Sequence, residues 1–533
     1  MAPSDADSRR PLLPRIWQHA FGRVLLCILG LGVSTYLSVM TLSVVLLNGG
    51  GIGWLVAFNT DDARVQIGRA YSPWPGRVVF RDLHLEIHDS ASHFDLRVAR
   101  GEVDVDLAAL LERRFEGENL QAQGARVQIR FAQAYQSAER EARLPRLSAP
   151  KPPNGETRAE DLWGVAVGID SVTFDEAWID DARVPGSIVV RGGFDLQPLR
   201  YLVVSDSQVE FNQCELWLGK SQVTRNLEGT LQVQLPRTEV DTQAGKRLSK
   251  HADVTTKLAA RVTDVAPLGL YLGEDWSLFG GEGTLSVDAR LRNQELSEGS
   301  HLNYQSPVLG VRHRSVSASG ASMLTLSRRE HAHGRWTFRD VDLRRGERGA
   351  RFGHATSVRL DVEAVGPLTE LGVSSAELDL KHASTPDLSK LPFALPSGIE
   401  RLSGAAKGDL NLRYAGGQVR GETSLKASEL SVEGEELGLK SDVWLSASAR
   451  ARAPFREVDL SRLSLDLRGA RVAAGRKGHS KPFRIALDTT RYRFNWKTLE
   501  AGGPLELELS DSEPLQRVAG ADVPGVAESL FGI

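Results

Sequence analysis

The sequence predicts a mainly β protein that carries a single N-terminal transmembrane helix and a few short helices further along. Three observations support this fold class. Residues 24–47 form an uncharged apolar run, long enough as a helix to cross the ~30 Å hydrocarbon core of a membrane. Beyond Asp61 apolar residues recur at every second position in segment after segment, as in strands with one buried face. Long helical periodicity is almost absent from that part.

The apolar run has the flanks of an uncleaved anchor. No A-x-A cleavage pattern follows it, and a signal peptide has a shorter apolar region. Arg9, Arg10, Arg15 and Arg23 precede the run, whereas its far side is uncharged and then acidic. Because positive charge stays on the cytoplasmic side, we expect the N-terminus inside and the body across the membrane.

The strands of the body are predicted from alternation. In the first of them Leu83, Leu85 and Ile87 alternate with His and Glu, and in the next Phe94 and Leu96 alternate with Asp and Arg. Later alternating segments are 229–235, 283–291, 408–414, 463–467, 491–496 and 503–509. Glycine often precedes such a run, where it would supply a turn conformation that other residues resist.

Short helical stretches interrupt this rhythm. Val103 and Val105 alternate with acids, and then residues 108–114 pack two adjacent leucines before charges, which predicts one or two helical turns. Two later stretches, 264–291 and 387–414, resemble each other. Each opens with an Asp suited to helix capping, continues with leucines four residues apart (Leu268 and Leu272, Leu391 and Leu395) and leads to an alternating strand. We interpret them as a repeat, which favours stacked sheet modules and an elongated molecule.

Such short helices allow two interpretations. One is a plug over the apolar end or edge of a sheet whose inner face is otherwise uncovered. The other is a corner between the two sheets of a sandwich. Polar or Pro-rich connectors at 134–160 and 236–250 break the body, and the first is predicted to be a mobile linker or an insertion.

Motifs of catalysis are missing from the chain. It contains no G-x-S-x-G, P-loop or H-E-x-x-H motif, and the glycine-rich stretch 48–53 adjoins the membrane run. His331 and His333 lack a third ligand at useful spacing, and the Asp180–Asp181 pair suits a turn. We therefore expect no enzyme, with no catalytic, cofactor-binding or metal-binding residues.

The net charge and the number of cysteines argue against two further classes of protein, nucleic-acid binders and disulfide-rich secreted domains. The formal net charge of −3 argues against a nucleic-acid binder. The most basic stretch, 344–359, is interpreted as a solvated loop, with contact to anionic lipid head groups as the alternative. The two cysteines are Cys27, inside the apolar run, and Cys214, interpreted as a packed thiol, so a disulfide-stapled secreted domain is excluded.

The first part of the chain resembles a known family. Four segments follow the apolar run in the family's order: 76–89, the strand and paired-leucine turn of 98–114, the strands of 115–131, and 165–196 after the Pro-rich connector. This order is similar to that of the AsmA-like family, which includes TamB-related proteins of the cell envelope. The resemblance covers roughly residues 20–200 and is only architectural beyond them.

The resemblance implies an inner-membrane protein with a single span, a cytoplasmic N-terminus and a periplasmic body. The body would be an elongated, curled antiparallel sheet forming a β-groove with a few short helices. The predicted order is a cytoplasmic segment (1–22), a transmembrane helix (23–48), an N-terminal AsmA-like β module (49–133), the linker or insertion (134–160), a second β module (161–262), a repeat module with a short helix (263–385), and a second copy with the C-terminal strands (386–533).

The resemblance also implies a function in lipid transport between membranes or in envelope homeostasis. The groove would shield phospholipid acyl chains without a cofactor, and its candidate lining residues are Leu83, Leu85, Ile87, Val103 and Val105. Its partners would be phospholipid, the inner membrane and other envelope proteins, with no nucleic acid. Two alternatives stay open: a structural or assembly scaffold built of closed β-sandwiches, and an envelope hydrolase whose site is assembled from distant residues.

Overall fold

The computed structural model describes most of the chain from Ala63 onward. The described residues are 63–74, 76–88, 92–131, 141–149, 163–197, 200–239, 250–273, 275–346, 349–366, 372–391, 399–434, 437–452, 457–474, 480–495, 500–504 and 506–511. Nearly all of them are in strands, so the predicted mainly β fold is confirmed. The chain divides into two compact units, one of residues 1–209 with 235–244 and one of 210–234 with 245–533.

No helix among the described residues is long and apolar enough to cross a membrane. The predicted cytoplasmic segment, 1–22, and the predicted transmembrane helix, 23–48, lie outside the described residues.

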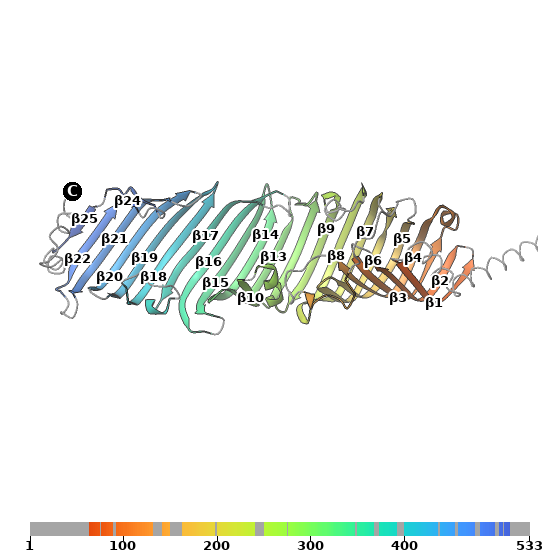
Figure 1. The fold of residues 1–533 in the computed structure, drawn as a ribbon, viewed down its shortest axis with the longest axis horizontal. Coiled ribbons are helices and arrows are strands. Elements are labelled where there is room, and N and C mark those ends of the chain that lie inside the picture. Colours follow the sequence, from red (N-terminus) through yellow and green to blue (C-terminus); the bar gives the residue numbers. More distant parts are fainter. Residues whose placement is uncertain are drawn as a thin grey trace, which may run out of the picture. The chain divides into compact units, whose positions relative to one another are not determined.

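The first unit is a curled sheet of long strands (Figure 1). Its strands are β1 (Ala63–Trp74), β2 (Arg77–His88), β3 (Ser92–Val105), β4 (Arg114–Phe131), β5 (Gly164–Ile179), β6 (Ala182–Gln197) and the first part of β7 (Tyr201–Leu218). Neighbours from β1 to β4 pair antiparallel, and so do β5 and β6. The β4–β5 pair is parallel, which corrects the expectation of a wholly antiparallel sheet. The long connection between these strands allows β5 to start at the same end as β4.

The second unit is an antiparallel ladder in chain order, apart from short branches. Its strands are the second part of β7, most of β8 (Ser221–Glu239), then β9 (Asp253–Val262), β10 (Trp276–Gly280), β11 (Gly283–Arg292), β12 (Glu295–Leu296), β13 (His301–His313), β14 (Val316–Arg328), β15 (Ala332–Arg345), β16 (Arg351–Val365), β17 (Gly372–Thr385), β18 (Arg401–Ala415), β19 (Gln418–Glu433), β20 (Leu437–Arg452), β21 (Glu457–Ala474), β22 (Phe483–Thr489), β23 (Tyr492–Asn495), β24 (Glu500–Gly502) and β25 (Glu506–Leu509). Both β10 and β11 pair with β13, and β21 pairs with β22 and β23.

Bulges recur in every second strand of one part of this ladder. Asp340 in β15, His382 in β17, Glu429 in β19 and Gly469 in β21 all have positive φ. Each lies where its strand contains one extra residue against at least one neighbouring strand. A bulge bends a strand and increases its twist. Four bulges in alternate strands therefore help to curl the sheet.

Three short 3₁₀ helices lie where the sequence predicts helical turns. They are η1 (Ala109–Glu112), η3 (Ala266–Tyr271) and η5 (Leu388–Lys390). In front of them Asp106, Asp264 and Asp387 each accept a hydrogen bond from the backbone N–H two residues on, at 2.8, 2.9 and 3.0 Å. Asp387 is the N-cap of η5, as predicted, whereas the N-cap of η3 is Val265 and Asp264 lies one residue before it. The copies differ afterwards, since the first leads to two strands, β10 and β11, and the second to the single strand β18.

Three expectations about connections and turns need correction. Residues 236–239 continue β8, so the connector predicted at 236–250 begins later. The basic stretch 344–359 is mostly strand, because β15 ends at Arg345 and β16 begins at Arg351. Gly229 and Gly408 lie inside strands and not in turns. A Cβ at Gly408 would lie 2.2 Å from the carbonyl oxygen of Ser424, so this glycine permits a close approach of two backbones.

Part of the predicted mobile linker is packed against the sheet. Leu144 in this segment is buried. The Arg130 guanidinium donates a hydrogen bond to the carbonyl oxygen of Leu147 at 2.8 Å, and a His88 ring nitrogen lies 2.9 Å from the carbonyl oxygen of Ala149. Residues 141–149, which belong to the connection between β4 and β5, are therefore docked on the sheet.

Candidate functional site

The five predicted lining residues lie together on one face of the first unit. On β2, Leu83 pairs with Ile67 and Val98, and Leu85 with Val65 and Leu96. Ile87 continues the same face beside Phe94. On β3, Val103 is buried opposite Val78, and Val105 packs against the same apolar cluster. These residues belong to a set in which successive strands place apolar side chains opposite one another: Ile67, Leu83, Val98, Ala125, Phe174 and Ile188 form one such row.

A residue with positive φ, Asp82, brings the two halves of β2 onto this common face without a change of register against β1 or β3. Strict alternation would place Phe80 and Leu83 on opposite faces of the strand. Asp82 between them has a φ of 55°, and both Phe80 and Leu83 contribute to one hydrophobic cluster. Alternation within each half was visible in the sequence, whereas the change of phase at Asp82 was not.

The second unit has the same division into an apolar and a polar face. Its apolar rows consist of residues beyond the five that the sequence predicts. One row joins Trp336, Leu360, Leu378 and Leu412. Another joins Leu425, Leu445, Leu465, Leu487 and Leu507. The alternating segments 408–414 and 463–467 carried the signal for part of these rows. We call this surface the apolar face of the second unit.

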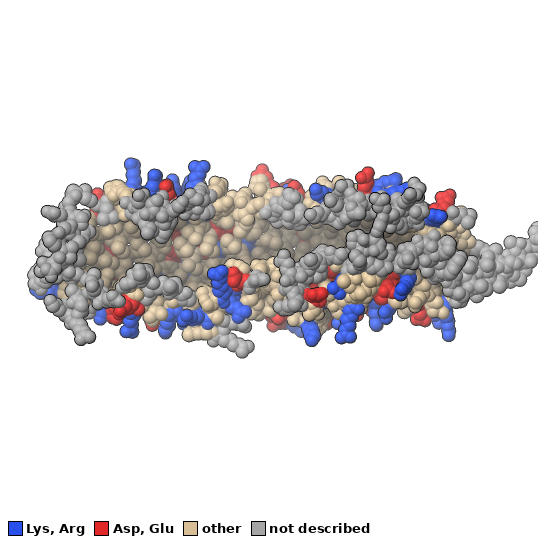
Figure 2. All heavy atoms as spheres, in the orientation of Figure 1, with Lys and Arg blue, Asp and Glu red and all other residues tan. Residues whose placement is uncertain are grey.

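Side chains of this face remain open to solvent. Leu326, Leu425 and Leu507 are each 38% exposed, which is high for leucines in a sheet face. Within the described residues of the unit no separate second sheet covers them. Figure 2 shows a hollow over the strands that Figure 1 labels β13 to β22, with a floor that is mostly free of Lys, Arg, Asp and Glu.

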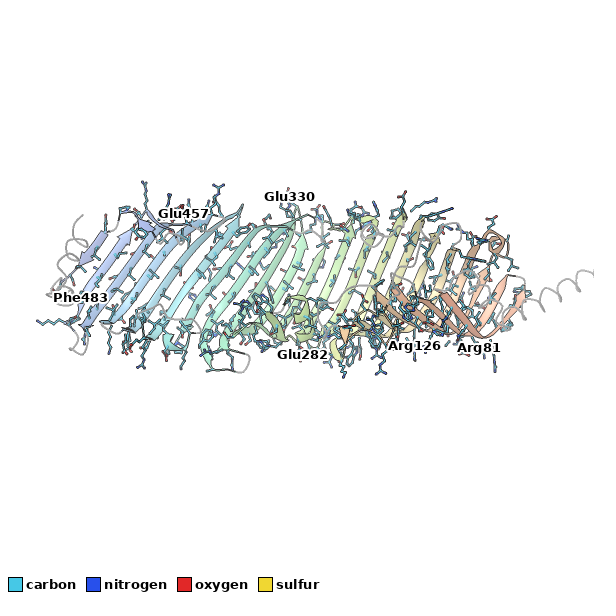
Figure 3. The ribbon with its side chains drawn as sticks, viewed as in Figure 1. Arg81, Arg126, Glu282, Glu330, Glu457 and Phe483 are labelled. Carbon is cyan, nitrogen blue, oxygen red and sulfur yellow. The ribbon has the colours of Figure 1, made fainter. Side chains whose placement is uncertain are left out.

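Charged side chains gather along the borders of the second unit. Glu330 and Glu457 lie along one border and Glu282 along the other (Figure 3). The face opposite the apolar rows carries a ladder of ion pairs across successive strands: Arg335 with Asp361 at 2.6 Å, Arg359 with Asp379 at 3.5 Å, and Arg413 with Glu377 at 3.2 Å. The hydrogen bond from Asn411, with help from Arg413, lowers the pKa of Glu377, so this acid stays ionised. We call this surface the polar face.

Short helices cover parts of the apolar face. Leu268 in η3 packs against the buried cluster that contains Val262 and Leu309. Leu388 in η5 packs against the cluster that contains Ala427 and Phe483. These contacts agree with the interpretation of the short helices as plugs on a one-sided sheet.

The candidates for chemistry form no catalytic centre in the described part of the chain. No group of three or more His, Cys, Asp or Glu side chains there could hold a metal ion. His333 has the single acidic neighbour Asp361, at 3.6 Å. Cys214 is fully buried, and this burial raises the pKa of its thiol, which disfavours the nucleophilic thiolate. Asp180 and Asp181 lie in the turn between β5 and β6, as the sequence predicts.

Comparison with known proteins gives no match. No protein-family model, no curated protein and no solved structure matches it. The functional argument therefore rests on the geometry of the two faces.

Proposed function

We propose that the apolar face binds the acyl chains of phospholipids and shields them from water. The observation that supports this most strongly is the series of apolar rows across consecutive strands, with leucines that are still 38% exposed. Exposed apolar rows of this extent are typical of a surface that binds a partner. An acyl chain fits because it needs no specific polar contact.

The energetics of such binding are simple. Burial of each methylene contributes about 0.8 kcal/mol. A chain lying across several strands would therefore bind by contact with the rows alone, and it could move along them, because successive rows offer similar surroundings. The ion-pair ladder on the opposite face would keep the loaded sheet soluble.

The proposal includes a cellular setting. The uncharged run 24–47 would anchor the protein in the inner membrane with a cytoplasmic N-terminus, and the β body would lie in the periplasm, as in the AsmA-like family. The groove would then support lipid movement between membranes or envelope homeostasis.

Lipid extraction tests this proposal. The full-length chain is purified in detergent, washed with lipid-free detergent and analysed by native mass spectrometry and by phospholipid phosphorus. We expect phospholipid in at least a one-to-one ratio. A folded chain that retains no lipid, and that takes none up from added short-chain phospholipid, would contradict the proposal and favour the scaffold.

A further inference from the structure

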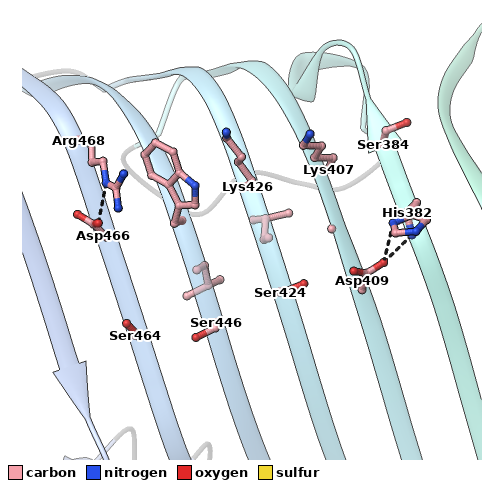
Figure 4. A pocket seen from close by; sticks show the side chains of 14 residues that line it. His382, Ser384, Lys407, Asp409, Ser424, Lys426, Ser446, Ser464, Asp466 and Arg468 are labelled. Carbon is pink, nitrogen blue, oxygen red and sulfur yellow. Dashed lines mark hydrogen bonds and ion pairs between the residues drawn. The ribbon is translucent and has the colours of Figure 1, made fainter.

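The polar face of the second unit contains a hollow that acyl-chain binding does not use. It lies across β17 to β21 (Figure 4). Its main features are a pair of lysines, Lys407 and Lys426, beside Trp444, and a row of three serines, Ser424, Ser446 and Ser464. All six side chains belong to the face opposite the apolar rows, because their neighbours along each strand, such as Leu425 and Leu445, belong to those rows.

The two lysines are direct cross-strand neighbours. Lys407 on β18 pairs in register with Lys426 on β19, and neither forms an ion pair with an acid of the described chain. Like charges directly opposite each other destabilise a sheet. Elsewhere on this face some cross-strand neighbours are ion pairs, as in the ladder through Arg335 and Asp361, and others are like charges, as where Arg413 faces Arg420. An anion lying between the two ammonium groups would relieve their repulsion, and the hollow gives it room beside them.

Trp444 fixes the cations around the hollow. The Lys426 ammonium lies 4.9 Å from the centre of the Trp444 ring, and the Arg468 guanidinium lies 4.4 Å from it. Such cation–π contacts restrict long, flexible side chains. The lysine is thereby held over the floor of the hollow.

The acids that line the hollow are already engaged. Asp466 forms ion pairs with Arg468 and Arg484, each at 2.8 Å. Asp409 accepts the backbone N–H of His382 at 2.6 Å. Neither acid forms an ion pair with Lys407 or Lys426 in the described part of the chain. The amide that Asp409 accepts is neutral, so this carboxylate keeps its charge, and the two ammonium groups outnumber it.

The floor of the hollow supplies uncharged hydrogen-bond donors, which are serine hydroxyl groups. Ser424 on β19, Ser446 on β20 and Ser464 on β21 are successive partners in register, so their side chains form one row across three strands. None of these hydroxyl groups has a hydrogen-bond partner within the described part of the chain. Ser424, the hydroxyl nearest in the sheet to the two ammonium groups, together with them suits a group with several negatively charged oxygens.

We propose that this hollow binds a phosphoryl group, as a phosphate ester or a phosphodiester. Lys407 and Lys426 supply the charge, and Ser424, on the same strand and face as Lys426, donates a hydrogen bond to a phosphoryl oxygen. Ser446 and Ser464 lie one and two strands further away, at about 4.8 Å per strand, and continue the uncharged floor. The site lies on the face opposite the acyl-binding rows, and its occupation does not require a lipid in the groove.

Calorimetric titration of the full-length chain in detergent tests this site. The probes are inorganic phosphate, glycerol 3-phosphate and a short-chain phosphatidylglycerol. We expect Lys407→Gln and Lys426→Gln each to weaken binding of the recognised probe about tenfold, and added salt to weaken it further. The control is Lys440→Gln, which removes an exposed positive charge from β20 outside the hollow and should leave the affinity unchanged.

The outcomes separate the sources of the phosphoryl group. Lysine-dependent binding of the water-soluble probes shows a site for free phosphate or its esters. Lysine-dependent binding of the lipid alone shows a head-group site, and either result supports the proposal. No lysine-dependent binding of any probe, or an equal loss in Lys440→Gln, would overturn it. Loss of lipid from the apolar face through Leu326→Asp, with unchanged phosphate affinity, would show that the two faces act separately.

Discussion

The backbone N–H of His382 donates a hydrogen bond to Asp409 Oδ1 at 2.6 Å, which joins a bulge of β17 to the next strand. The same relationship recurs one bulge further along, where the N–H of Glu429 in β19 donates to Asp442 Oδ1 at 2.8 Å. A bulge leaves one residue outside the regular ladder, so its N–H needs another acceptor. In both places an aspartate of the following strand is that acceptor.

Loss of this acceptor should loosen the bulge. Asp442→Ala is expected to lower the free energy of local opening at Glu429 by about 1–2 kcal/mol, because the N–H loses its partner. Hydrogen exchange of the Glu429 amide measures this. Asp488→Ala, an exposed aspartate on β22, is the control and should leave the amide unchanged. Equal exchange rates in wild type and Asp442→Ala would show that the side chain does not hold the bulge.

Asp466 should make the free energy of unfolding depend on pH. The hydrogen bond from Arg484, helped by Arg468 and opposed by burial, lowers the pKa of Asp466 in the folded state. A carboxyl whose folded pKa is depressed contributes stability that is fully present above its unfolded pKa, near 4, and is lost as the pH falls through the folded pKa.

The matching variant is Asp466→Asn. It should be about 0.5–1 kcal/mol less stable than wild type at pH 7, and the difference should shrink as the pH falls below about 4. Urea unfolding followed by β-sheet circular dichroism at several pH values measures the difference. A gap that is constant from pH 7 to pH 3 would contradict this assignment.

Gly229 should tolerate no side chain. Its φ is +133°, and a Cβ at this position would lie 2.0 Å from the carbonyl oxygen of Lys257 on β9. Gly229→Ala is therefore expected to cost about 1–3 kcal/mol. Thermal unfolding measures the loss, and Gly502→Ala serves as the control, because a Cβ there would meet nothing within 4 Å. Similar melting temperatures for the two variants would refute the close approach.

Cys214 should be inert in the folded protein. It is fully buried and its thiol pKa is raised by that burial. In a Cys27→Ser background, Cys214 should react with a disulfide reagent at neutral pH at least about a hundredfold more slowly when native than in denaturant. Fast reaction of the native protein would mean that this part of β7 opens readily.

Much of this fold follows from residue spacing, and the exceptions have physical causes. Alternation at Leu83, Leu85 and Ile87 reveals a one-sided strand, and the Asp before each short helix reveals its start. The phase change at Asp82 depends on a positive φ that Asp adopts only in a suitable tertiary setting. The parallel β4–β5 pair depends on the path of the crossover, which composition does not encode. The hollow at Lys407 and Lys426 was also missed, because the two lysines meet only through strand register.

The central claim is that the apolar face binds acyl chains, and two residues of β14 test it most directly. Leu326 and Met323 are 38% and 37% exposed, but Leu326 pairs with Leu302 on the apolar face and Met323 with Thr337 on the polar face. The measurement is the molar ratio of bound phospholipid to folded chain for Leu326→Asp and Met323→Asp, purified side by side. We predict a clear loss of lipid in Leu326→Asp, because an acyl chain lying on the rows would remove water from the new carboxylate. We predict the wild-type ratio of lipid to protein in Met323→Asp. Equal lipid content in both variants would contradict the account.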